Sequence, residues 1–67
     1  MKRDTIYNAM LLTKSAAGFM ANALCAHDAE DYGLRDQMIG LAEIQARNAN
    51  AVIAAMIPTF AQKEIAA

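Results

Sequence analysis

Polar and apolar residues follow one another along the first third of the chain with the period of an α-helix. In residues 5–26 the polar side chains Asn8, Ser15 and Asn22 recur every seven positions and form one narrow stripe. The opposite side carries apolar residues, namely Ile6, Met10, Ala17, Met20, Ala21 and Leu24. Asp4 precedes this segment as a candidate N-cap. We therefore predict a first helix over residues 5–26, apolar around so much of its girth that more than one neighbour must cover it.

A second helical pattern ends at residue 57, before Pro58. Its polar face carries Asp36, Gly40, Glu43, Arg47 and Asn50, and its apolar face carries Leu34, Met38, Leu41, Ala42, Ala49, Val52, Ile53 and Met56. Glu43 and Arg47 stand four residues apart in the favourable order for an ion pair. Pro58 lacks an amide hydrogen and stops or kinks the helix. A short third helix over residues 60–65 is compatible with the spacing of Thr59 and Gln62.

Three acids, Asp28, Glu30 and Asp31, stand between the two patterns. Acids favour a helix N-terminus over a C-terminus, so we expect the second helix to begin near Asp28 or Asp31, or after Gly33. The connector is short and the helices are of similar length, which favours antiparallel packing. The predicted fold is all-α: one domain over residues 1–67 with helices over about 5–26 and 29/34–57.

One hairpin of this size cannot cover its own apolar surface. Close packing pairs large residues with small ones, and we expect Met20 to lie opposite Gly40. The core is thin because 16 of the 38 hydrophobic residues are alanine, and so small a domain usually needs a disulfide, a metal or a second subunit. We predict a homodimeric four-helix bundle whose interface and core contain Ile6, Met10, Ala17, Met20, Leu24, Leu34, Met38, Leu41, Gln45, Asn48, Val52, Ile53 and Met56.

Two features of the apolar faces leave alternatives open. Gln45 and Asn48 interrupt the face of the second helix; they either fix the register of an assembly from inside the core or lie at its rim in water. The internal methionines either fill gaps between helices or form an adaptable groove for a partner helix.

Candidate chemistry is confined to Cys25, His27 and the nearby acids. Side chains two residues apart on a helix point in different directions, and no second Cys or His completes a zinc site. We interpret Cys25 as a buried thiol and the acids as a solvated turn. The sequence thus predicts no metal, no cofactor and no catalysis, because a two-helix unit offers no pocket for a nucleophile and its base.

Charge indicates which partners the chain can bind. The formal net charge is −1, and six Lys and Arg residues are scattered along the sequence, which argues against binding driven by nucleic acid phosphates. Asp4 and Lys14 interrupt the pattern of a signal peptide, and no charge-free run reaches the roughly 18 residues of a membrane span. One unpaired Cys suits a reducing compartment, so we expect a cytoplasmic protein without a membrane span.

These observations favour a small non-catalytic helical interaction module, a regulator or adaptor that binds its own copy or a partner helix. The expected architecture is similar to that of the small hairpin chaperones and needle subunits of bacterial secretion systems, which gives a chaperone or filament subunit as one alternative. It is also similar to small dimeric RNA-binding hairpins of plasmid copy control, which gives an RNA-binding regulator as the other. Both likenesses are of architecture alone.

Overall fold

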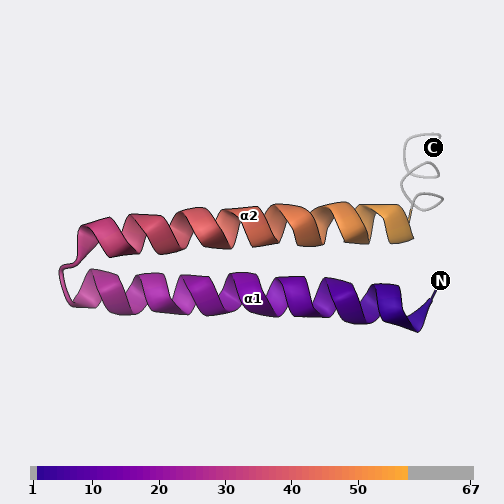
Figure 1. The fold of residues 1–67 in the computed structure, drawn as a ribbon, viewed down its shortest axis with the longest axis horizontal. Helices are drawn as coiled ribbons and strands as arrows, with labels where there is room; N and C mark the ends of the chain where they lie inside the picture. Colours follow the sequence, from indigo (N-terminus) through magenta and orange to yellow (C-terminus); the bar gives the residue numbers. More distant parts are fainter. Residues whose placement is uncertain (1, 58–67) are drawn as a thin grey trace, which may run out of the picture.

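The computed structural model describes residues 2–57 and consists of two antiparallel helices (Figure 1). Helix α1 spans Arg3–Asp28 and helix α2 spans Tyr32–Met56, and no strand occurs between residues 2 and 57. The predicted all-α hairpin is therefore confirmed. The third helix predicted over residues 60–65 lies outside the described residues.

Alanines spaced by seven residues form the seam where α1 and α2 meet. Within residues 2–57 the five buried side chains are Ala9, Ala23 and Ala26 of α1 and Ala42 and Ala49 of α2. In α1 the residues between them at spacings of three and four are Leu12, Ala16 and Phe19. In α2 the same spacings place Met38, Gln45 and Val52 before, between and after the two alanines. A repeat of seven residues keeps one stripe of each helix against its partner. Because alanine is small, the two axes can approach closely.

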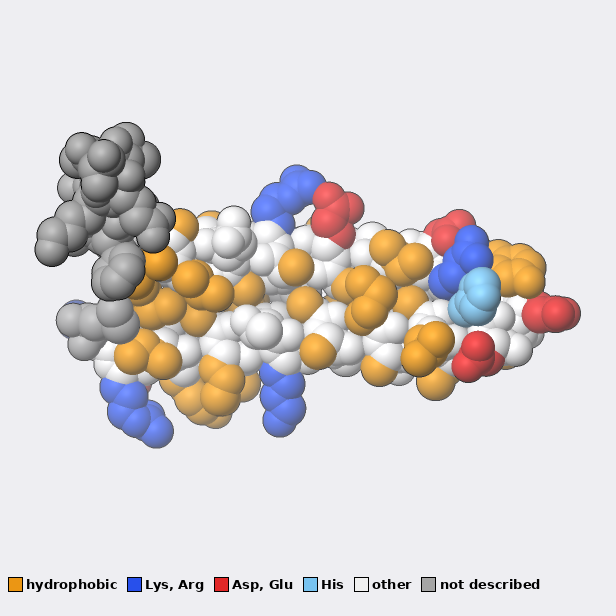
Figure 2. All heavy atoms as spheres, turned by 180° about the vertical axis from the view of Figure 1, so that it is seen from behind, with side chains coloured by type: hydrophobic (Ala, Val, Ile, Leu, Met, Phe, Trp, Pro, Cys, Tyr) orange, Lys and Arg blue, Asp and Glu red, His pale blue; other side chains and the backbone are white. Residues whose placement is uncertain are grey.

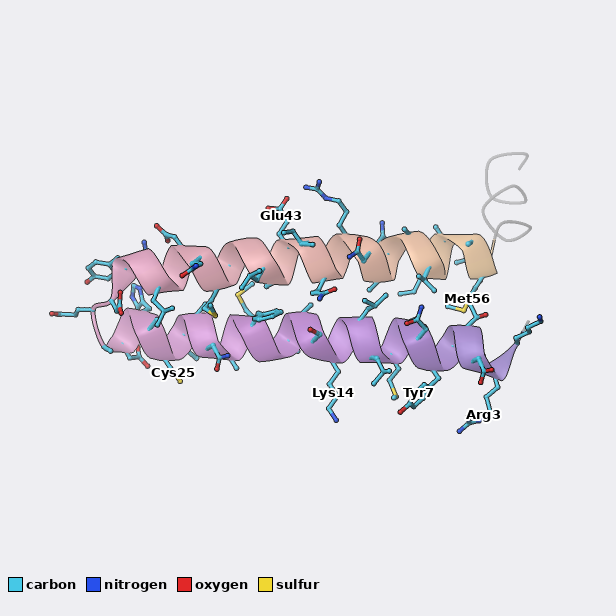
Figure 3. All side chains as sticks on the ribbon, in the orientation of Figure 1. Arg3, Tyr7, Lys14, Cys25, Glu43 and Met56 are labelled. Atoms are coloured by element: carbon cyan, nitrogen blue, oxygen red, sulfur yellow. The ribbon has the colours of Figure 1, made fainter. Side chains whose placement is uncertain are left out.

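Large and small side chains alternate across this seam. The turn fixes which residues lie at the same level, because both helices rise about 1.5 Å per residue away from it. Phe19 is thus level with Ala42, and Met38 is level with Ala23. Met56 points from the far end of α2 toward α1 (Figure 3). The alternation lets each large side chain lie beside a small one from the facing helix.

Gly40 does not take part in this packing. A Cβ added at Gly40 would meet no atom within 4 Å, so this residue lies on the outer side of α2. The prediction that Met20 lies opposite Gly40 is therefore wrong. Met20 itself is 50% exposed, at the side of the seam rather than within it.

The turn between the helices uses a left-handed residue. Glu30 has φ of 60°, and it follows Ala29, the C-cap of α1. The amide of Asp31 donates to the carbonyl of Ala26 at 2.9 Å, and the amide of Glu30 donates to the carbonyl of His27 at 3.0 Å. These two bonds satisfy carbonyls that α1 leaves free at its end, in the arrangement of a Schellman motif.

Both helix starts differ from the sequence prediction in detail. Helix α1 begins at Arg3 after the N-cap Lys2, whose side chain makes no capping hydrogen bond, so Asp4 is a first-turn residue and not the cap. An acid in the first turn still interacts favourably with the helix dipole. Helix α2 begins at Tyr32, and Oδ1 of the N-cap Asp31 accepts from the amide of Leu34 at 3.2 Å. Of the starts considered, the one at Asp31 is confirmed.

Helix α1 also has the length and composition of a membrane-spanning helix, at the lower limit. Its most apolar 18-residue window has a mean hydropathy of 1.2, and 17% of that window is buried in the hairpin. Every such window within α1 contains Lys14, and an amine at the centre of a bilayer costs about 2.5 to 3.5 kcal/mol. No charge-free run in residues 2–57 reaches 18 residues, yet this window passes a test of length and mean hydropathy that tolerates Lys14. The expected lack of a membrane span and the cytoplasmic location both stay predictions.

Candidate interaction surface

One side of the hairpin is a continuous apolar surface. Its α1 residues recur at spacings of three, four and seven, and its α2 residues recur every seven. We call this surface the apolar flank and define it as Ile6, Met10, Ala17, Met20 and Leu24 of α1 with Ile39, Ala46 and Ile53 of α2. Its six large side chains are 40% to 63% exposed. Figure 2 shows hydrophobic side chains along both helices on the side that carries the single histidine.

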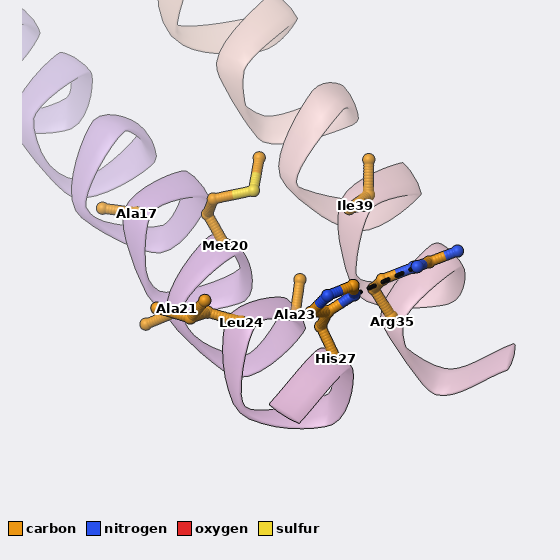
Figure 4. A pocket seen from close by; sticks show the side chains of 8 residues that line it. All are labelled: Ala17, Met20, Ala21, Ala23, Leu24, His27, Arg35 and Ile39. Carbon is orange, nitrogen blue, oxygen red and sulfur yellow. Dashed lines mark hydrogen bonds between the residues drawn. The ribbon is translucent and has the colours of Figure 1, made fainter. Parts of the chain in front are cut away.

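A groove of about 590 Å³ hollows the apolar flank near the turn (Figure 4). Ala17, Met20 and Leu24 line it from α1, and Ile39 lines it from α2. The groove is possible because alanines such as Ala23 replace larger side chains along its floor. Its shape and its lining suit an apolar side chain supplied by another helix.

A polar cluster closes the groove at the turn. The guanidinium of Arg35 lies 3.1 Å from Nδ1 of His27, and its carbon lies 4.8 Å from the centre of the Tyr32 ring. Nε of Arg35 donates to Oδ1 of Asp36 at 2.9 Å. An arginine only donates hydrogen bonds, so Nδ1 of His27 is the acceptor. The cluster joins the last turn of α1 to the first two turns of α2.

The opposite flank of the hairpin is mixed in character. There α1 presents the polar stripe of Asn8, Ser15 and Asn22, in which Ser15 is half-buried and the other two are exposed. Leu11, beside this stripe on α1, is 44% exposed, and helix α2 presents Leu34, Leu41 and Ile44 on this side, which are 42%, 37% and 56% exposed. The polar stripe makes this flank a poorer site for apolar association than the apolar flank.

The structure divides the predicted interface residues into three groups. Four lie half-buried at the seam, namely Met38, Gln45, Val52 and Met56. Six lie on the apolar flank, namely Ile6, Met10, Ala17, Met20, Leu24 and Ile53. Three lie on the opposite flank, namely Leu34, Leu41 and Asn48. The predicted interface contains none of the α1 seam residues, because the prediction for α1 is centred on larger side chains. The recurrence of Ala9, Ala16 and Ala23 every seven residues was the signal that could have found it.

The two amides of α2 differ in their surroundings. Gln45 is half-buried at the seam, level with Ala16, and Asn48 is exposed. No buried side-chain nitrogen or oxygen within residues 2–57 lacks a hydrogen-bond partner. Within a single hairpin both amides therefore reach water, as the rim interpretation predicts. A role in fixing the register of an assembly stays a prediction.

Cys25 does not occupy the position that the sequence suggested. Its thiol is exposed on α1, so the interpretation as a buried thiol is wrong. Figure 3 places Cys25 on the outer side of α1, together with Tyr7 and Lys14. In the described part of the chain, no three His, Cys, Asp or Glu side chains lie close enough together to hold a metal ion.

Charged side chains lie outside the middle of the apolar flank. The predicted pair is confirmed, since Nη2 of Arg47 donates to Oε1 of Glu43 on the outer face of α2. Lys14 points away from α2 at mid-length (Figure 3). Most described acids gather around the turn, where Figure 2 shows red side chains at one end of the molecule.

Comparisons with known protein families, with characterised proteins and with solved structures found no match to this chain.

Proposed function

We propose that this chain is a non-catalytic helical interaction module that binds its own copy through the apolar flank and forms a homodimeric four-helix bundle. One observation carries the proposal: in the described part of the chain all five buried side chains are alanine, while 13 large hydrophobic side chains between residues 6 and 57 are at least 37% exposed. A soluble domain normally packs two layers of secondary structure around its core. This hairpin is a single layer, 13 Å across its shortest axis.

The energy of covering the apolar flank is of the size that association needs. Full burial of an Ile, Leu or Met side chain is worth about 1.5 to 3 kcal/mol, and the six large members are already partly buried, which leaves about 1 kcal/mol each. Two copies therefore gain roughly 10 kcal/mol. Association costs on the order of 4 to 15 kcal/mol. Because the gain and the cost are of similar size, the loss of a single flank side chain should be enough to disrupt the proposed dimer.

The charges favour a helix over a nucleic acid as the occupant. Arg35 and Arg47 are both engaged by carboxylates. Lys2 and Arg3 stand at one end of α1, and Lys14 points outward from its middle. A nucleic acid needs several free cations along one face, and the apolar flank is lined by hydrophobic side chains at its centre.

Sedimentation equilibrium at micromolar concentration tests this proposal. We expect twice the mass of the 7.2 kDa chain. Leu24→Asp places a charge at the most exposed of the large flank side chains, and Ile39→Asp places one on the α2 side of the flank. Each substitution should shift the equilibrium to monomer. Asn22→Asp makes a similar change of charge on the polar stripe and should leave the mass unchanged.

A wild-type chain that sediments as a cooperatively folded monomer would refute self-association. The flank would then belong to a helix of another protein, which is what the chaperone alternative predicts. Equal dissociation by Leu24→Asp and Asn22→Asp would also contradict the proposal, because the two substitutions affect different sides of α1.

A further inference from the structure

We infer that the two hairpins pack antiparallel, so that the turn of one copy lies beside the open end of the other. This inference rests on the proposed self-association and adds the orientation of the partner. It is carried by the distribution of charge along the hairpin and by the positions of Arg3 and Asp28 on α1.

Charge is divided unevenly between the ends of the hairpin. Around the turn, Asp28, Glu30, Asp31 and Asp36 stand against Arg35, which leaves a net charge of −3 in residues 28–36 with His27 neutral. At the open end, Lys2 and Arg3 stand against Asp4, a net charge of +1. The remaining described charges, Lys14, Glu43 and Arg47, lie near mid-length. Within residues 2–57, each copy is thus acidic at its turn and basic at its open end.

Arg3 and Asp28 border the apolar flank at opposite ends of α1. Eighteen residues make five full helical turns, so Asp28 lies on the same side of α1 as Met10, and Arg3 lies on the same side as Ala21. Arg3 shares a small hollow with Ile6 and Met10, and Ala21 lines the groove. The two opposite charges are separated by roughly 37 Å along the helix.

Two-fold symmetry allows two face-to-face arrangements of the flanks. An axis across the helices places α1 on α1 of the second copy, in opposite directions, and brings the turn of each copy to the open end of the other. Arg3 of each copy then lies near Asp28 of its partner. An axis along the helices places α1 on α2 and brings both acidic turns together. Complementary charges favour the first arrangement, and like charges oppose the second.

Distances between spin labels distinguish the two arrangements. In a Cys25→Ala background, a label at Ala29→Cys reports on the turn, and a label at Lys14→Cys reports on the middle of α1; both positions are exposed. In the antiparallel dimer the two turns lie about 40 Å apart, while the Lys14 positions lie at nearly the same level on adjacent helices. We expect a long distance at residue 29 and a short one at residue 14.

The reverse order of the two distances would overturn the antiparallel inference and leave self-association intact. Absence of any dipolar coupling, together with a monomeric mass in sedimentation, would overturn the proposed function itself. Circular dichroism of both labelled variants should match that of the wild type, which ensures that the distances report on folded hairpins.

The effects of salt and of charge removal on the Kd of the dimer provide a second test, because these effects have opposite signs in the two arrangements. In the antiparallel dimer, raising NaCl from about 50 mM to about 500 mM screens attraction and should raise the Kd about threefold to tenfold. Asp28→Asn should raise the Kd about threefold at low salt, whereas Glu43→Gln, on the outer face at mid-length, should leave it unchanged. A parallel dimer would instead tighten with salt and with Asp28→Asn, and either result would overturn the inference.

Discussion

Arg35 donates a hydrogen bond to Nδ1 of His27 across 3.1 Å and thereby ties the first turns of α2 to the last turn of α1. The same guanidinium covers the Tyr32 ring, and the rings of Tyr32 and His27 lie 5.7 Å apart. One cation thus holds two side chains, one from each side of the turn. This cluster fixes the relative position of the helices where the groove ends.

Replacing Arg35 by alanine should lower the free energy of unfolding by about 1 kcal/mol, because the substitution removes a hydrogen bond and a cation–π contact at a partly exposed site. Urea denaturation followed by circular dichroism gives this value. Arg47→Ala is the matched control: its ion pair with Glu43 is well exposed, and its loss should cost only a few tenths of a kcal/mol. Equal costs for both substitutions would contradict a special role of the cluster.

Replacing a seam alanine by a larger side chain should destabilise the hairpin. Ala42 is 2% exposed and level with Phe19, so Ala42→Leu forces the helices apart or Phe19 out of its position. Overpacking of this kind costs about 1 to 3 kcal/mol. Ala54→Leu, at an exposed position of the same helix, should change the free energy of unfolding by less than about 0.5 kcal/mol. A neutral Ala42→Leu variant would show that the seam is not closely packed.

Glycine at position 30 should stabilise the protein. Glu30 has a positive φ, which costs an ordinary residue about 1 kcal/mol and costs glycine nothing. Glu30→Gly should therefore raise the midpoint of urea denaturation. Ala29→Gly serves as the control, since Ala29 has φ of −84° and gains nothing from glycine. A lower midpoint for Glu30→Gly would mean that the carboxylate contributes more than the backbone strain costs.

The acids of the turn should differ in their effects on stability. Asp31 caps α2, so Asp31→Ala should cost about 1 kcal/mol of unfolding free energy. Asp28 is the last residue of α1, where a negative charge is unfavourable to the helix dipole. Asp28→Ala should therefore leave the hairpin as stable or slightly more stable when it is compared at low protein concentration. If Asp31→Ala and Asp28→Ala lowered the free energy of unfolding by similar amounts, the different roles of the two acids would be contradicted.

Much of the fold could be predicted from the sequence, and the reason is the helical period. The stripe of Asn8, Ser15 and Asn22, the spacing of Glu43 and Arg47, and the stop at Pro58 all depend on local geometry. The face of α1 that meets α2 could not be chosen by hydrophobicity alone, because Ile6 and Met20 are more hydrophobic than the alanines. Close approach of the helices favours the alanines instead, and that benefit depends on both helices together.

The details of the turn were harder to predict for a different reason. Gly33 is the residue whose type suggests a boundary, yet the left-handed position is occupied by Glu30. Asp28, Glu30 and Asp31 are similar in type but occupy a helix end, a strained turn and an N-cap. Their roles follow from a shift of one or two residues in the turn, which no residue type in this segment determines.

The single-layer build of the hairpin has a consequence for the stability of the proposed dimer. In that dimer the large side chains of the apolar flank are covered only when two copies meet. Folding and association would then share the same free energy, and the stability of each chain would depend on its concentration. The melting temperature should rise with protein concentration. In a cell, the rate of synthesis would then set the fraction of chains that are folded, and a chain made in small amounts would be exposed to proteolysis.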